Sequence, residues 1–189
     1  MKCNYVKKLS NVSKKDILLA GGKAVNLGEM INAKLPVPKG YVLVADAYRI
    51  FVSYNKIDKE IEKLLIDLDN NNKSIEKISN SIKVLFKQGI IPENLIAEID
   101  NLYSNFENSE VVVRSSATLE DTIETSFAGQ YESFLNIKNK EELFDSIKKC
   151  WASLWNPEGL SYRVKNNIKS DSLDIGVIIQ EFISGEESG

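Results

Sequence analysis

The chain has 189 residues, of which 43% are hydrophobic and 27% are charged, a composition typical of a globular protein with one domain or two small ones. Its formal net charge of −3 argues against nonspecific nucleic-acid binding, which requires a basic face, and no apolar stretch reaches the ~20 residues of a membrane span. The sequence contains no histidine, which excludes a Ser-His-Asp triad, histidine-ligated zinc and a phosphohistidine within the chain.

The first part of the chain is predicted to form a helix, a strand and a second helix. A glycine turn at residues 20–22 precedes helical periodicity over residues 23–31. Apolar residues 41–44 predict a strand, and Asp46 is the expected N-cap of a helix that follows it.

The middle of the chain carries three apolar stripes with helical spacing. They cover residues 57–68, 75–85 and 95–106, and Pro92 is the expected first helical position of the third. A polar, asparagine-rich link separates the first two stripes. We therefore expect a helical insertion over residues 56–108.

The last part of the chain alternates strands and helices. Apolar runs predict strands at residues 111–113, 131–137 and 174–183. A helix is expected from about residue 141, and Asn156-Pro157 predicts the cap and first residue of another. The order of elements predicts a mixed α/β chain of the α+β class.

The two cysteines, Cys3 and Cys150, lie far apart and fit no metal-ligand spacing. The first residues lack the apolar core of a signal peptide. We therefore expect reduced thiols in a cytoplasmic protein that binds neither membrane nor nucleic acid.

Gly21-Gly22-Lys23 is the first candidate anion site. A lysine at the start of a helix combines its own charge with the positive end of the helix dipole. The spacing is not that of a Walker P-loop, and a plain turn with a solvated lysine is the competing interpretation.

Arg114 is the second candidate, because it follows a buried apolar strand and precedes a run of small residues. An arginine there offers charge-assisted bonds to a phosphate, and small side chains let backbone N–H groups approach an anion. The alternative is a structural salt bridge, for instance to Glu120 or Asp121. Residues 124–129 predict either a loop that covers the phosphates or a simple hairpin loop.

Several collinear motifs resemble the N-terminal nucleotide-binding domain of the phosphoenolpyruvate synthase and pyruvate phosphate dikinase family, to which rifampicin phosphotransferase is related. The motifs are Ala20-Gly21-Gly22-Lys23-Ala24, Leu27-Gly28-Glu29-Met30, Val37-Pro38-Lys39-Gly40-Tyr41, Val113-Arg114-Ser115-Ser116-Ala117-Thr118, Ser126-Phe127-Ala128-Gly129-Gln130, Cys150-Trp151-Ala152-Ser153-Leu154, Ser161-Tyr162-Arg163 and Gln180-Glu181-Phe182-Ile183. The resemblance covers nearly the whole chain and is weakest over residues 56–108.

The resemblance implies that residues 1–189 form the N-terminal part of an ATP-grasp domain, in which ATP lies between two α+β subdomains. It implies that Lys23 contacts the ATP phosphates and that Arg114 holds them during transfer. The remaining residues implied to bind ATP are Ser126, Phe127, Ala128 and Gly129 as a phosphate cover, and Gln180, Glu181 and Ile183 at the adenine edge.

The family pattern extends beyond the last motif of this chain. The second half of the ATP-grasp unit, which is expected to supply the Mg²⁺ ligands, has no counterpart here, nor do the phosphohistidine and substrate domains. We therefore expect the ATP-binding portion of a dikinase-type phosphotransferase that is inactive by itself. Its partner would be a phosphohistidine domain of the parent enzyme, and an unpaired edge strand would also suit a homodimer.

Three functional interpretations remain open at this stage. The first is an enzyme that phosphorylates a histidine on another domain and then pyruvate. The second is a relative that phosphorylates a rifampicin-type antibiotic, and the third is a nucleotide-binding module without chemistry.

Overall fold

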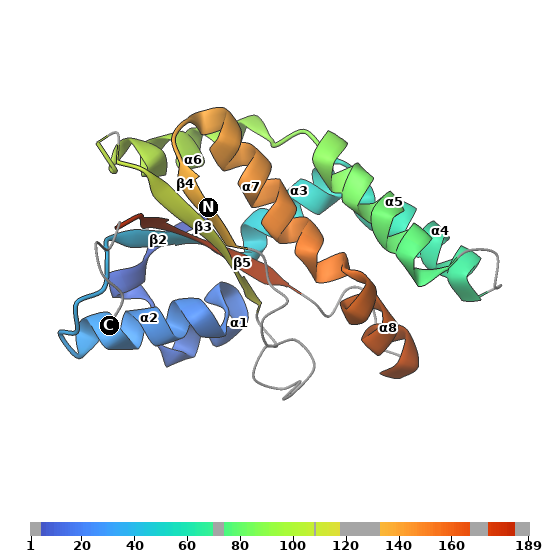
Figure 1. Cartoon of the computed structure of the whole chain (residues 1–189), viewed down its shortest axis with the longest axis horizontal. Helices are drawn as coiled ribbons and strands as arrows, with labels where there is room; N and C mark the ends of the chain where they lie inside the picture. The colour runs from blue at the N-terminus through green and yellow to red at the C-terminus, as the bar shows by residue number, and fades with distance from the viewer. Residues whose placement is uncertain (1–4, 70–73, 108, 118–132, 167–173, 184–189) are drawn as a thin grey trace.

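A five-stranded antiparallel sheet is the centre of the fold (Figure 1). The computed structural model describes residues 5–69, 74–107, 109–117, 133–166 and 174–183. The sheet order is β1-β2-β5-β3-β4. The strands are β1 (Val6–Lys8), β2 (Gly40–Leu43), β3 (Val111–Ala117), β4 (Ser133–Ile137) and β5 (Ile175–Glu181).

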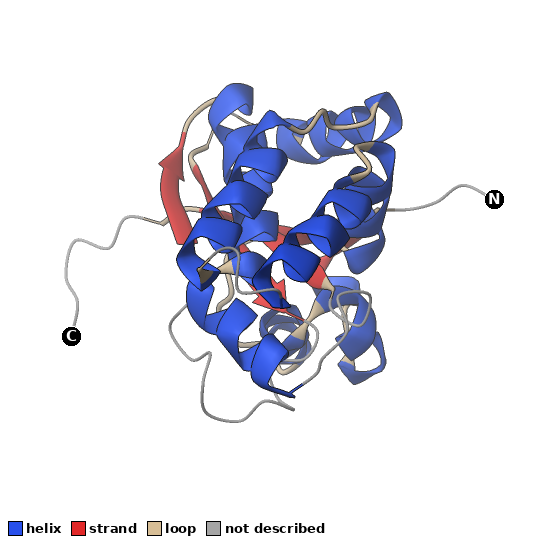
Figure 2. Cartoon of the chain, turned by 90° about the vertical axis from the view of Figure 1, so that its right-hand side faces the viewer, coloured by secondary structure: helices blue, strands red, loops and turns tan. Residues whose placement is uncertain are grey.

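Helices cover both faces of this sheet, as Figures 1 and 2 show. One face carries α1 (Ile17–Ala20) and α2 (Gly22–Asn32), which follow the short 3₁₀ turns Leu9–Asn11 and Lys14–Asp16. The larger layer on the other face contains α3 (Ala45–Tyr54), α4 (Ile57–Asp69), α5 (Ile75–Gln88), α6 (Glu93–Ser104), α7 (Lys140–Ala152), the 3₁₀ turn Ser153–Trp155 and α8 (Pro157–Asn166). The mixed α+β class predicted from the sequence is confirmed.

Alternation along the strands divides the apolar side chains between two cores. On β5, Val177 and Ile179 face the larger helical layer, whereas Ile178 packs with Ala24 and Val25 of α2. The larger core is rich in aromatic rings, and the Phe51 ring lies 4.7 Å from the Trp151 ring between centroids. The sheet therefore separates a small α1–α2 side from a thick helical side.

The three helices predicted in the middle of the chain are confirmed as α4, α5 and α6, and each buries its apolar stripe in the larger core. Two boundary predictions were wrong, the first by two residues and the second by one. The N-cap of α3 is Val44 and not Asp46, because the amide of Ala47 already bonds the Val44 carbonyl. Pro92 caps α6 from outside the helix, which begins at Glu93.

The strand β3 differs from its prediction in a way that matters for the site. It continues through Ser115 and Ser116 to Ala117, so Arg114 lies in mid-strand and the small residues are not a loop. The cause is unbroken pairing with β5, in register from Val111 opposite Glu181 to Ala117 opposite Ile175. This partner strand is too distant in sequence for local periodicity to reveal it.

Candidate functional site

The turn between α1 and α2 lies directly against β3 and β5. Gly21 has φ 81° and ψ 164°, a conformation that only glycine adopts readily. A Cβ atom on Gly21 would lie 2.2 Å from the backbone oxygen of Ser116, and one on Gly176 would lie 2.6 Å from that of Ala20. Two glycines therefore let the start of α2 approach the sheet at backbone contact distance.

Two hydrogen bonds, made by Ser116 and Lys23, hold the N-terminus of α2 against β3. The buried Ser116 hydroxyl accepts a 3.1 Å hydrogen bond from the amide of Ala24, one of the first-turn N–H groups that a helix leaves outside its own ladder. The Lys23 amine donates to the backbone oxygen of Ser115 at 3.4 Å, across 92 residues of sequence. Lys23 is thus half-buried beside β3, which differs from the competing interpretation of a solvated lysine.

Arg114 comes to the same side of the sheet as Lys23. It lies two residues before Ser116 on a strand with unbroken alternation, and Ser116 faces α2. Its side chain is half-buried, and within the described ranges no hydrogen bond or ion pair reaches its guanidinium. The proposed salt-bridge partners Glu120 and Asp121 lie outside the described residues. A guanidinium and an ammonium from distant segments therefore share one sheet face.

Gln180 shares this face, whereas Glu181 does not. On β5, Gln180 stands two residues from Ile178, the residue opposite Arg114, so both side chains point toward the α2 side. Gln180 is 4% exposed, and its side-chain amide donates to the Pro38 carbonyl at 2.9 Å. The Glu181 side chain points to the other face, and its amide donates to the Lys39 carbonyl at 2.9 Å.

The structure gives less support for the remaining predicted site residues. Ile183 follows β5 and is 65% exposed, so it contributes no packing to this face. The predicted phosphate cover, Ser126 to Gly129, lies outside the described residues.

Two residues of this arrangement were missed by sequence reasoning, namely Ser116 as an anchor for α2 and Gly176 as the space that Ala20 occupies. Glycine inside an apolar strand is a recognised sign of a close backbone approach, and Gly176 stands in such a strand. That signal was available in the sequence.

Over the residues that the structure describes, no group of three or more aspartate, glutamate or cysteine side chains gathers into a metal-binding cluster. None of the described helices has the length and apolar character needed to cross a membrane.

Comparison with known proteins identifies the family. Residues 17–189 match the family described as "Pyruvate phosphate dikinase, AMP/ATP-binding domain". The chain is 35% identical over 192 residues to a probable phosphoenolpyruvate synthase of Methanothermobacter thermautotrophicus, a match that covers 98% of this chain and 28% of the relative. It is 37% identical over 187 residues to one of Archaeoglobus fulgidus, covering 96% of this chain and 25% of the relative.

A third relative, the phosphoenolpyruvate synthase of Aeropyrum pernix, is 40% identical over 189 residues, which cover 96% of this chain and 23% of the relative. The chain therefore spans between 23% and 28% of the length of these three curated relatives. The match over residues 17–189 and the identities to these relatives show that the chain belongs to the pyruvate phosphate dikinase, AMP/ATP-binding domain family.

Proposed function

We propose that the chain binds the phosphates of ATP where α2 meets β3, and that it is the ATP-binding portion of a phosphoenolpyruvate synthase-like phosphotransferase. The observation that carries the proposal is that Lys23 and Arg114 lie on one sheet face, beside the N-terminus of α2. The positive end of the helix dipole adds to their charge. Family membership supports ATP as the ligand.

The chemistry suits such a site. Phosphoryl transfer requires positioned cations that neutralise charge developing on the transferred group more than it requires a covalent catalyst. Lys23 would hold the phosphates as a point charge, and Arg114 would grip phosphoryl oxygens with paired N–H groups. Residues 126–129 would cover the phosphates with backbone amides.

The adenine would lie near the end of β5, at Gln180, Glu181 and Ile183. Because the amides of Glu181 and Phe182 are already bonded to the carbonyls of Lys39 and Glu110, we expect carbonyl oxygens to supply much of this contact. An ATP-grasp arrangement would place a second subdomain over the nucleotide, with the ligands for Mg²⁺.

The phosphoryl acceptor would be a histidine on another domain, from which the group passes to pyruvate. The chain has no histidine, so this acceptor cannot be within it. The relatives named above are phosphoenolpyruvate synthases, which favours pyruvate over an antibiotic as the final substrate. A module that binds nucleotide without chemistry remains the alternative that the following experiment separates.

Calorimetry with ATP and Mg²⁺ tests the proposal on this chain and on a longer enzyme that contains it. Lys23→Ala and Arg114→Ala should weaken ATP binding, and each should lower phosphorylation by the longer enzyme by about 10²–10³-fold. Lys15→Ala is the matched control, because Lys15 is exposed in a different turn and its loss changes the charge equally.

Thermal unfolding of the same variants separates binding from folding. Variants that bind no ATP and also unfold would make Lys23 and Arg114 structural and would remove the support for the site. Binding by the short chain alone, with no phosphorylation by the longer enzyme, would favour the non-catalytic module.

A further inference from the structure

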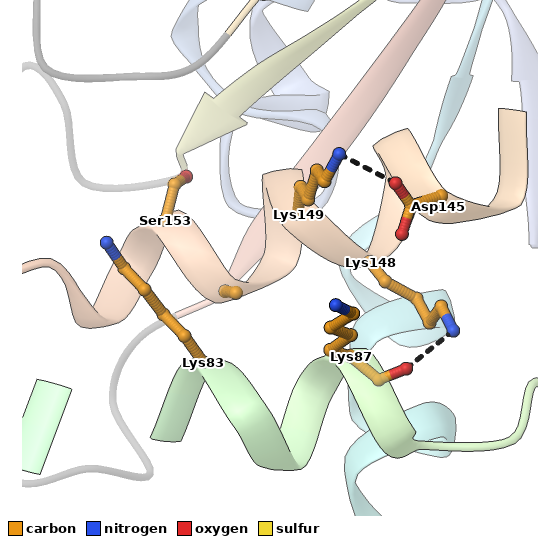
Figure 3. Close-up of a pocket in the computed structure, with 7 residues that line it drawn as sticks. Lys83, Lys87, Asp145, Lys148, Lys149 and Ser153 are labelled. Carbon is orange, nitrogen blue, oxygen red and sulfur yellow. Dashed lines mark hydrogen bonds and ion pairs between the residues drawn. The ribbon is translucent and has the colours of Figure 1, made fainter. Parts of the chain in front are cut away.

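A groove between α5 and α7 is lined by seven residues, of which four are lysines. Its volume is about 200 Å³, and it lies on the helical layer, on the other side of the sheet from α2 (Figures 1 and 3). Its charged lining consists of Lys83 and Lys87 on α5 and of Asp145, Lys148 and Lys149 on α7. This local excess of positive charge occurs in a chain whose net charge is −3.

Two of the four lysines already have partners. Lys149 pairs with Asp145 at 2.7 Å, and the amine of Lys148 donates to the backbone oxygen of Lys87 at 2.8 Å, near the end of α5. The first contact neutralises the acidic group of the groove. The second satisfies a carbonyl that the helix end leaves outside its ladder.

The amines of Lys83 and Lys87 have no hydrogen bond or ion pair with any residue that the structure describes. Both side chains extend from α5 toward α7 in Figure 3. They stand four residues apart on one helix, so they lie on the same face, where like charges destabilise a helix. A bound anion between them would remove that repulsion.

We propose that this groove binds a small organic phosphate in its dianionic form. Lys83 and Lys87 stand at different points along the groove, the first nearer Ser153 and the second nearer Lys148, and supply its positive charge and N–H donors for phosphoryl oxygens. The buried Ala152 at the base of the groove offers an apolar surface for the organic part. The volume is below the ~300–1,000 Å³ of sites for drug-sized ligands, which indicates a ligand of few atoms.

Calorimetric titration of this chain with glycerol 3-phosphate, in a buffer of low ionic strength, tests the proposal. Lys83→Ala and Lys87→Ala should each weaken binding by about tenfold, the loss expected for one charge-assisted bond. The double variant Lys59→Ala/Lys77→Ala is the matched control, since both lysines are exposed on α4 and α5 away from the groove and the charge change is the same. It should bind like the parent chain.

Three further measurements define what would overturn the proposal. Glycerol 3-phosphate that still binds fully to the Lys83→Ala/Lys87→Ala variant would lie elsewhere, for instance at the nucleotide face, and would overturn the proposal. Inorganic phosphate that binds as tightly as the ester would remove the organic part of the site. Hexaglutamate that binds more tightly than the ester would make the groove a surface for acidic protein segments.

Stability measurements separate a ligand site from a structural cluster. Lys83→Ala/Lys87→Ala should unfold at the same temperature as the parent chain without ligand, or higher, because like-charge repulsion is removed. Glycerol 3-phosphate should raise the unfolding temperature of the parent chain and of the Lys59→Ala/Lys77→Ala control, but not that of the Lys83→Ala/Lys87→Ala variant. A clearly lower unfolding temperature of the ligand-free double variant would show that the lysines stabilise the fold, and would overturn the proposal.

Discussion

Replacing Gly21 by alanine tests the idea that glycine brings α2 to the sheet. The new Cβ would lie 2.2 Å from the Ser116 carbonyl oxygen, a backbone atom that cannot swing away. The residue would also be held at φ 81°, ψ 164°. Strain of this kind costs about 1–3 kcal/mol, and overpacking costs about 1–3 kcal/mol more. We expect a loss of about 2–6 kcal/mol in unfolding free energy.

Gly176→Ala is the matched variant, because it introduces a similar contact without the dihedral strain. Its Cβ would lie 2.6 Å from the Ala20 oxygen, and Gly21 is the one described glycine with positive φ. Its expected cost is therefore the overpacking alone, about 1–3 kcal/mol. Urea denaturation followed by circular dichroism measures both values. A Gly21→Ala protein within about 0.5 kcal/mol of the parent would refute the reasoning, since that is the range of neutral surface substitutions.

Three other perturbations follow from buried or paired polar groups. Burial raises the pKa of Tyr48 from 10.0 to about 12. The unfolding free energy should therefore keep its full value below pH 10 and fall by up to about 3 kcal/mol as the pH rises to 12. Urea denaturation at several pH values in that range would detect the fall. Ser79→Ala deletes the hydroxyl that donates to the Trp155 carbonyl at 2.6 Å and should lower the free energy of unfolding by about 1 kcal/mol. An unchanged urea midpoint would show that this hydrogen bond does not contribute to stability. The hydrogen bond from Lys7 holds the pKa of Asp16 below 3.8, so stability should fall as the pH drops through that lowered pKa. Asp16→Asn should flatten this acid limb, and identical acid limbs would contradict the pairing.

Much of the fold was predictable because its signals are local. The helical periodicity over residues 23–31 and the three stripes of α4 to α6 mark helix faces that pack against the two cores, although Met30 of the first stripe is 41% exposed. The start of α8 at Pro157 after Asn156 was likewise readable, and the Asn156 side chain accepts from the Gly159 amide at 2.7 Å.

The details of the candidate site were less predictable, because they depend on pairing between distant segments. The extension of β3 past Arg114 follows from its register with β5, whose paired residues lie 58 to 62 positions later in the sequence. The same register separates Gln180 from Glu181 by sheet face, and the contact of Gln180 with Pro38 spans 142 residues. Sequence motifs placed these residues together in a site without showing which side chains share a face.

The position of β5 has a consequence for folding of the chain during its synthesis on the ribosome. Of the strands that the structure describes, β5 comes last in sequence, yet it lies between β2 and β3 in the sheet. Until residues 175–181 have left the exit tunnel, the β1–β2 and β3–β4 ribbons have no strand to join them. Isolated two-stranded ribbons are marginally stable in water, so the nascent chain should expose its apolar strands until synthesis is nearly past this point. Nascent-chain lengths on either side of β5 should therefore differ sharply in protease resistance and in chaperone dependence.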